Sequence, residues 1–129
     1  MHILYKSFTI SIFPANFDYA STETLGQSEE GRDMRLMKLC QGGCGNKPAM
    51  WIDGGIHARE WITPATVTFF VKQLTEDLDD QSLIDNLDWY ILPSVNPDGY
   101  AYTQSNDRLW RKTRYVHWLW TLQCNGYSW

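Results

Sequence analysis

Apolar and polar positions repeat along the chain with two periods, and each period predicts a different kind of element. Residues 34–39 alternate between apolar and polar side chains, which is typical of a half-buried strand, and the apolar run 49–53 predicts a second strand. The glycine-rich segment 40–47 between them is typical of a hairpin-like connection, so we expect these two strands to pair. Residues 8–13 also alternate and predict a strand, whereas the polar stretch 21–31 predicts a loop.

Helical spacing follows the second of these strands. Thr63 and Pro64 predict the N-cap and the first position of a helix, since proline lacks the N–H that the first turn leaves unpaired. Residues 82–87 predict a short second helix, the apolar run 88–95 a buried strand, and residues 96–99 a turn. The residues that recur at three- and four-residue intervals, and so form the apolar face of the first helix, are Val67, Phe70, Val71, Leu74 and Leu78.

This order of elements predicts the fold class. Strand, loop, helix and strand in succession indicate an α/β fold, in which a sheet packs against helices. The chain has 129 residues, of which 43% are hydrophobic and 20% are charged, so we expect one globular domain at most. Sites in such folds lie beyond the carboxyl ends of the strands, which is where the segments 54–61 and 96–99 fall.

The segment 54–61, Gly-Gly-Ile-His-Ala-Arg-Glu-Trp, carries the main candidate chemistry. It places His57 and Glu60 three residues apart, directly after a predicted strand. Imidazole nitrogen and carboxylate oxygen both bind Zn²⁺, which catalytic sites hold with three protein ligands and one open position. The two glycines allow a sharp turn and a close approach of the backbone. The spacing alone also fits a strand-to-helix turn with a surface ion pair.

A second cluster of charges lies at residues 106–114, which include Arg108, Arg111, Lys112 and Arg114. Three interpretations fit such a segment: a solvated basic face, a nucleic-acid contact in which Trp110 stacks between arginines, or an anion site whose guanidinium groups bind carboxylates and stabilise oxyanions. The net charge of −4 argues against nucleic acid and against an acidic membrane surface as partners. No apolar run approaches the roughly 20 residues of a membrane span, and residues 1–13 lack the pattern of a signal peptide.

The chain contains three cysteines, Cys40, Cys44 and Cys124. Cys40 and Cys44 flank a flexible turn, and they are either paired in a small local loop or free. A zinc ribbon would need a second pair of Cys or His ligands, which the sequence lacks. The odd count leaves Cys124 without an evident partner, so cysteine usage does not decide the compartment.

Three blocks of the sequence become specific when they are taken together. Ser-Glu-Glu-Gly-Arg-Asp-Met stands at 28–34 and Trp-Ile-Asp-Gly-Gly-Ile-His-Ala-Arg-Glu-Trp-Ile at 51–62. Leu-Pro-Ser-Val-Asn-Pro-Asp-Gly-Tyr at 92–100 is followed by Asn-Asp-Arg-Leu-Trp-Arg-Lys-Thr-Arg at 106–114. From residue 25 to 114 the chain thereby resembles the zinc metallocarboxypeptidase family of the pancreatic carboxypeptidases A and B. Related zinc acylases share the His-x-x-Glu after a strand but lack the Trp-Arg-Lys-Thr-Arg block.

The resemblance implies an exopeptidase that removes one residue from the C-terminus of a peptide or protein, with Zn²⁺ as its cofactor. On the family's pattern, His57 and Glu60 would be the first two zinc ligands. Arg111 would polarise the scissile carbonyl and stabilise the tetrahedral oxyanion, and Arg59 and Arg108 would lie along the substrate cleft. The family further implies secretion to the extracellular space and a monomer.

The chain departs from the family's pattern at both ends. We expect residues 1–24 to be an unmatched leader, 25–114 a part of the catalytic domain with a partial mixed sheet and flanking helices, and 115–129 an unmatched aromatic tail. The family's third zinc ligand, its general-base glutamate and its groups for the terminal carboxylate come later in the sequence, and His117 in the tail is not expected to replace that ligand. We therefore expect a truncated chain. The alternative function is that of an inactive fragment, which binds zinc weakly or binds peptide without cleaving it.

Overall fold

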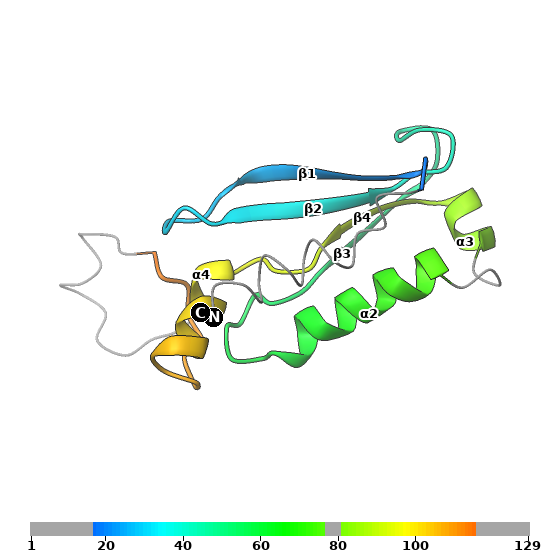
Figure 1. Ribbon diagram of the computed structural model, residues 1–129. Helices are drawn as coiled ribbons and strands as arrows, with labels where there is room; N and C mark the ends of the chain where they lie inside the picture. Colours follow the sequence, from blue (N-terminus) through cyan, green and yellow to red (C-terminus); the bar gives the residue numbers. More distant parts are fainter. Residues whose placement is uncertain (1–16, 77–80, 116–129) are drawn as a thin grey trace.

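A long helix crosses one face of a four-stranded sheet (Figure 1). The computed structural model of the chain describes residues 17–76 and 81–115. The strands lie in the order β1-β2-β4-β3, with β3 and β4 parallel and the other neighbours antiparallel, which confirms the expected α/β fold with a mixed sheet and flanking helices. The strand predicted at 8–13 falls outside the described residues. The elements are β1 (Ala20–Gln27), β2 (Asp33–Leu39), β3 (Ala49–Asp53), α2 (Ile62–Glu76), α3 (Gln81–Asn86), β4 (Asp88–Leu92) and α4 (Pro97–Ser105).

Strand β1 occupies much of the region where the polar composition predicts a loop, so that prediction is wrong. Most of its side chains are exposed, and it pairs with β2 from Ala20 opposite Leu39 to Gln27 opposite Asp33. Backbone hydrogen bonds to a single neighbour suffice to hold such an edge strand, and they require no apolar alternation. The turn is confined to residues 28–32.

Strands β2 and β3 do not pair, contrary to the sequence prediction, because β4 lies between them. Trp89 and Ile91 of β4 are 5% and 0% exposed, and the neighbouring Asp88 and Leu92 are also buried. A short apolar strand with both faces covered is stable in the middle of a sheet, where both of its edges find partners. The connection from β2 to β3 is therefore a crossover past the end of β4 and not a hairpin.

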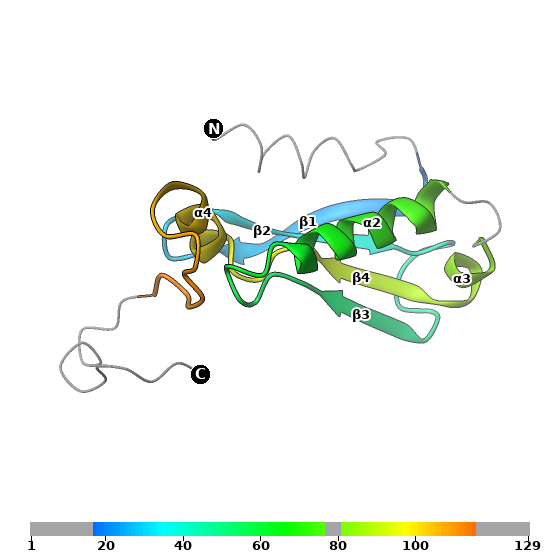
Figure 2. The same cartoon turned by 90° about the horizontal axis from the view of Figure 1, so that it is seen from below.

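Both views show helix α2 lying along one face of the sheet (Figure 1 and Figure 2). The hydrophobic core lies between the two. The predicted apolar face of α2 is confirmed for its described residues, whereas Leu78 falls outside them. Phe70 packs edge-on against Trp89 with 5.5 Å between ring centroids. Full burial of a core side chain such as Val71 or Leu74 contributes about 1.5 to 3 kcal/mol to the free energy of unfolding. None of the described helices is long and apolar enough to cross a membrane. The buried core residues are Met37, Leu39, Val67, Val71, Leu74, Ile84, Trp89 and Ile91.

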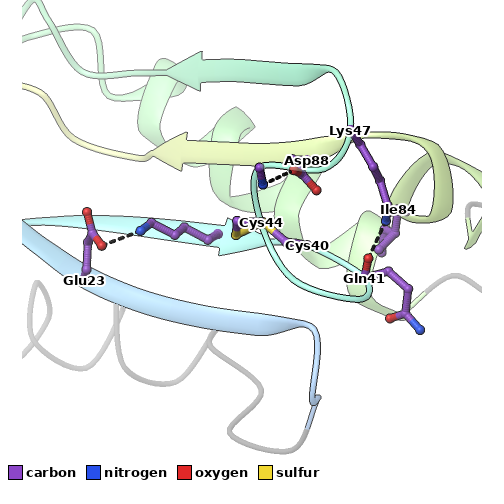
Figure 3. Close-up of a disulfide and its surroundings, with 9 residues drawn as sticks. Glu23, Cys40, Gln41, Cys44, Lys47, Ile84 and Asp88 are labelled. Carbon is purple, nitrogen blue, oxygen red and sulfur yellow. Dashed lines mark hydrogen bonds and ion pairs between the residues drawn. A yellow bond between two sulfur atoms is a disulfide. The ribbon is translucent and has the colours of Figure 1, made fainter.

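A disulfide between Cys40 and Cys44 closes one end of the sheet (Figure 3). Of the two alternatives for these cysteines, paired or free, the structure has the paired form. Cys124 lies outside the described residues. The small loop brings the N–H of Gly45 to 2.7 Å from Asp88 Oδ2, at the start of β4. The hydrogen bond from Gly45 therefore attaches the disulfide loop, which follows β2, to the beginning of the neighbouring strand β4.

Helix α3 confirms the short helix expected at residues 82–87. Lys47 connects the same crossover to this helix. Its Nζ donates hydrogen bonds to the carbonyl oxygens of Gln41 at 2.6 Å and Ile84 at 3.2 Å (Figure 3). A cation at this point neutralises carbonyl dipoles that the crossover and the end of α3 would otherwise leave unpaired.

The opposite end of the sheet carries the corner that leads from β3 into α2. Gly55 has a φ angle of +69°, which glycine adopts without steric cost. Its N–H donates to Thr63 Oγ1 at 3.0 Å, and this hydroxyl donates to the carbonyl of Glu60 at 2.9 Å. Helix α2 begins at Ile62, so the prediction of Thr63 as its N-cap is wrong. The Thr63 hydroxyl instead connects the first turn of the helix to the corner.

Residues 96–99 begin helix α4, where the sequence predicts only a turn. Asn96 is the N-cap, since its Oδ1 accepts a hydrogen bond from the N–H of Gly99 at 2.9 Å, and a proline follows it in the first turn. Strand β4 ends at Leu92 and not at residue 95, because Pro93 cannot donate to the ladder.

Asp98 connects α4 to the turn between β1 and β2. The residue is only 3% exposed. Its carboxylate accepts hydrogen bonds from three groups: the hydroxyl of Ser28 at 2.6 Å, the N–H of Glu30 at 2.9 Å and the guanidinium of Arg32 at 2.7 Å. Burial by itself raises the pKa of Asp98, but these hydrogen bonds and the charge of Arg32 bring that pKa below its ordinary value.

Arg32→Ala removes the charge that faces Asp98 and should lower the free energy of unfolding by about 2 to 3 kcal/mol at pH 7, because a buried carboxylate is left without its counter-charge. Arg35→Ala is the matched control. The guanidinium of Arg35 lies 4.0 Å from Asp33 and both side chains are more than a third exposed, so we expect less than about 0.5 kcal/mol. Urea unfolding followed by circular dichroism measures both values, and equal losses would contradict the role given to Arg32.

The same carboxylate predicts a pH dependence. Because the pKa of Asp98 is lower in the folded than in the unfolded protein, its contribution to stability is fully present above the unfolded-state pKa of about 4. That contribution is lost as the pH falls through the folded-state value. The difference in unfolding free energy between wild type and Arg32→Ala should therefore shrink as the pH is lowered from about 5 to about 2, because Asp98 becomes protonated over that range. A difference that stays constant over this range would exclude Asp98 as the group responsible.

Candidate metal-binding site

His57 and Glu60 lie on the turn between β3 and α2, beyond the carboxyl ends of the parallel pair β3 and β4. The turn is tight, since the N–H of Glu60 donates to the carbonyl oxygen of His57 at 3.2 Å. Ala58 between them is 1% exposed, and its N–H donates to the carbonyl oxygen of Arg111 at 3.1 Å. The backbone of this turn is thus fixed from inside the protein, next to the segment that carries Arg111.

The side chains of His57 and Glu60 meet at the imidazole Nδ1. Glu60 Oε1 lies 3.1 Å from it and Oε2 lies 3.2 Å from it. A tetrahedral zinc ion with bonds of about 2.0 to 2.1 Å separates two of its ligand atoms by about 3.3 Å. The side chains are 29% and 41% exposed, which leaves them accessible from solvent. This pair of donors therefore fits Zn²⁺ in both chemistry and separation.

The guanidinium of Arg111 reaches the same imidazole nitrogen. Arg111 Nη2 lies 3.5 Å from His57 Nδ1. Arginine can only donate, so Nδ1 accepts from Arg111 when the imidazole proton is on Nε2, and it donates to Glu60 in the other tautomer. Three of the residues singled out from the sequence thus converge on one atom.

Arg108 and Arg59 lie beside this group. The guanidinium carbon of Arg108 lies 3.8 Å from the centroid of the Trp61 ring, and its Nη1 donates to the carbonyl oxygen of Arg59 at 2.9 Å. Trp61 in turn donates from Nε1 to Thr103 Oγ1 at 2.9 Å. Arg108 is held over the ring that follows Glu60, whereas Arg59 joins the group through its carbonyl and its side chain is exposed.

Arg114, the last cation of the 106–114 segment, contacts aromatic rings of the same chain. Its guanidinium carbon lies 4.0 Å from the ring centroid of Tyr102 and 5.2 Å from that of Trp110. Its Nε donates to Glu30 at 3.3 Å, in the turn between β1 and β2. The three arginines of this segment therefore each contact a different part of the molecule, and they do not form one uniform basic face.

Asn96 is the residue near this site that the sequence analysis does not single out. It is 5% exposed and lies between the segments of His57 and Arg111. The signal for it is the order Asn-Pro-Asp-Gly, which places an N-cap residue, a proline and an acid as at a helix start. Interpreted only as a turn, the same four residues give no reason to look for a buried amide.

Within the two described ranges, no group of three or more His, Cys, Asp or Glu side chains lies close enough to hold a metal ion. The part of the chain that the structure describes thus provides two candidate zinc ligands, His57 and Glu60, and His117 falls outside it. A catalytic zinc site needs one further protein ligand and an open position.

Comparisons with known proteins point to one family. A family model described as zinc carboxypeptidase matches residues 13–126. Carboxypeptidase B of Astacus astacus is 53% identical over 100 residues, which cover 75% of this chain and 32% of that protein. Carboxypeptidase A1 of Bos taurus is 48% identical over 96 residues, which cover 71% of this chain and 23% of that protein. The chain thus spans about a third or less of the length of these relatives.

Solved structures give the same result. Bovine thrombin-activatable fibrinolysis inhibitor, in complex with a tick carboxypeptidase inhibitor, superposes with a TM-score of 0.76 at 39% identity, over 88% of this chain and 36% of that one. Carboxypeptidase A from Helicoverpa armigera has a TM-score of 0.76 at 30% identity, over 95% of this chain and 29% of that one. Because the family model covers residues 13–126 and the solved structures superpose on most of the chain, the chain belongs to the zinc carboxypeptidase family.

Proposed function

We propose that this chain forms part of a zinc-dependent carboxypeptidase, which hydrolyses the C-terminal peptide bond of peptides and proteins. The observation that carries the proposal is the convergence of Glu60 and Arg111 on His57 Nδ1, at distances of 3.1 Å and 3.5 Å. A metal ligand pair next to a guanidinium suits the hydrolysis of an amide, since a bound metal can activate water and the guanidinium can bind the developing oxyanion.

In this proposal His57 and Glu60 would hold a zinc ion together with a third ligand. Such an ion would supply Lewis acidity, which lowers the pKa of a bound water molecule to about 7. Arg111 donates hydrogen bonds to the carbonyl oxygen of the scissile bond, where negative charge develops. The contact of Arg111 with His57 supports this role, because it keeps the guanidinium beside the metal ligands.

Arg59 and Arg108 are proposed to contact the peptide substrate. The stacking of Arg108 on Trp61 supports a fixed orientation of its guanidinium, which reduces the entropy lost on binding a carbonyl or carboxylate group. The rings of Trp61, Tyr102 and Trp110 already contact arginine side chains of the same chain. That arrangement supports peptide recognition over stacking on nucleic-acid bases.

We place the protein in the extracellular space. The disulfide between Cys40 and Cys44 supports this location, because such bonds persist in oxidising compartments and are rare in the cytosol.

Glu60→Ala in the full-length protein should lower zinc affinity by more than about 100-fold, beyond the 10- to 100-fold effect typical of outer-shell changes, and abolish hydrolysis. Zinc content after dialysis and the release of C-terminal amino acids measure the two effects, and a chelator should reproduce the loss of activity in the wild type. Glu76→Ala is the matched control, since Glu76 is an exposed carboxylate paired with Lys72 on α2. Full zinc occupancy in Glu60→Ala would contradict the proposed ligand.

Arg111→Ala should lower kcat by about 10² to 10³, because an oxyanion donor acts mainly in the transition state. Zinc occupancy should be retained, since arginine is not a metal ligand. Steady-state kinetics on a peptide substrate and metal analysis separate the two properties, with Arg35→Ala as a control arginine on β2. A large rise in KM with kcat unchanged would assign Arg111 to ground-state binding and would contradict its catalytic role.

A further inference from the structure

The side chain of Asn96 makes three hydrogen bonds to backbone groups of three different segments. Its Oδ1 accepts from the N–H of Gly99 at 2.9 Å. Its Nδ2 donates to the carbonyl oxygens of Lys112 at 3.0 Å and Ile56 at 3.3 Å. Ile56 directly precedes His57, and Lys112 directly follows Arg111. We infer that Asn96 is a positioning residue that sets the separation of His57 and Arg111, an inference that rests on the proposed function of these two residues.

The amide has little freedom to move. A Cβ atom on Gly99 would lie 2.5 Å from Asn96 Nδ2, 2.7 Å from its Oδ1 and 2.7 Å from the carbonyl oxygen of Lys112. The side chain therefore packs directly against the backbone of α4, in space that only glycine leaves open. The backbone N–H of Asn96 also donates to the carbonyl oxygen of Gly55 at 3.2 Å. Asn96 is fixed at both its main chain and its side chain.

Asparagine suits this position for a chemical reason. The site presents one donor, the N–H of Gly99, and two acceptors, the carbonyl oxygens of Ile56 and Lys112. A primary amide offers one acceptor oxygen and two N–H donors, which matches this set. A carboxylate accepts only, so an Asp here would face both carbonyls with an oxygen. A Ser hydroxyl keeps the N-cap but is too short to reach two further carbonyls.

The placement of α4 does not depend on Asn96 alone. Asp98 separately connects this helix to the turn between β1 and β2, through hydrogen bonds from Ser28, Glu30 and Arg32. Loss of the Asn96 amide should therefore leave α4 in place and change the spacing between the two segments that it joins. That change would act on the 3.5 Å contact between Arg111 and His57.

The test compares Asn96→Ser and Asn96→Asp with Asn86→Ser and Asn86→Asp in the full-length protein. Asn86 is the matched control, because its Nδ2 donates to the carbonyl oxygen of Ser82 at 2.7 Å in an exposed hydrogen bond within helix α3. In both Asn96 variants we expect kcat to fall by about 10- to 100-fold with KM changed by less than about threefold, and zinc affinity to fall by about tenfold. The control variants should match the wild type.

A readout that needs neither zinc nor activity is the hydrogen exchange of the Ala58 amide, which donates to the carbonyl oxygen of Arg111. Its rate, measured by NMR, should rise about tenfold or more in Asn96→Ser and stay unchanged in Asn86→Ser. Unchanged kinetics, zinc affinity and exchange in folded Asn96 variants would overturn the inference. A wild type without zinc binding or activity would overturn the proposed function instead, and the exchange rate would still decide the role of Asn96.

A third variant tests the role of Asn96 in case the Asn96 variants do not fold. If neither Asn96 variant folds, Gly99→Ala retains the N-cap residue, and its Cβ pushes on both the Asn96 amide and the carbonyl oxygen of Lys112, so their hydrogen bond is disturbed. A folded Gly99→Ala variant with the same loss in kcat and the same rise in Ala58 exchange would support the inference. Loss of folding in all three variants, with the Asn86 controls folded, would show that Asn96 is required for the fold itself and would overturn it.

Discussion

The parallel pairing of β3 with β4 continues past the ends of both strands, and the arrangement of the site follows from it. After the ladder from Ala49–Asp88 to Asp53–Leu92, the N–H of Gly54 donates to the carbonyl of Leu92, and the N–H groups of residues 95 and 96 donate to the carbonyls of residues 54 and 55. Two chain segments that diverge into different helices are thereby kept side by side for several residues. His57 follows one of them, and α4 with the segment of Arg111 follows the other.

The middle of the sheet and the end that carries the site are stabilised by different interactions. Along the sheet, α2 covers an apolar core in which Met37, Val71 and Ile91 are almost fully buried. At the end where the strands point toward the site, buried polar groups such as Asn96 and Asp98 replace apolar contacts. Hydrogen bonds fix distances and directions more narrowly than apolar packing does, because they lose strength steeply with misalignment. A site that must hold a metal ligand beside a guanidinium benefits from that precision.

Sequence patterns identify the elements that carry an apolar face or an apolar run, and they miss the exposed strand β1. Strand β2 and the buried face of α2 follow from amphipathic spacing, and the candidate pair His57 and Glu60 follows from residue type and position after a strand. β1 carries no such signal, since its side chains are mostly exposed and its partner is reached through the backbone. The insertion of β4 between β2 and β3 is a non-local choice that no local pattern encodes. The contacts of Asn96 join carbonyls 40 and 16 residues away, beyond the reach of any sequence window.

The strand order also determines when the sheet can assemble. Within the described residues β3 pairs only with β4, yet β3 and all of α2 precede β4 along the chain. A polypeptide that leaves the ribosome from its N-terminus therefore presents β3, including the half-exposed Trp51, before a strand exists to receive it. The β1–β2 hairpin is a local structure and closes early, whereas β3 waits until residues 88–92 have emerged. The corner that carries His57 is consequently among the last parts of the described chain to acquire its native surroundings.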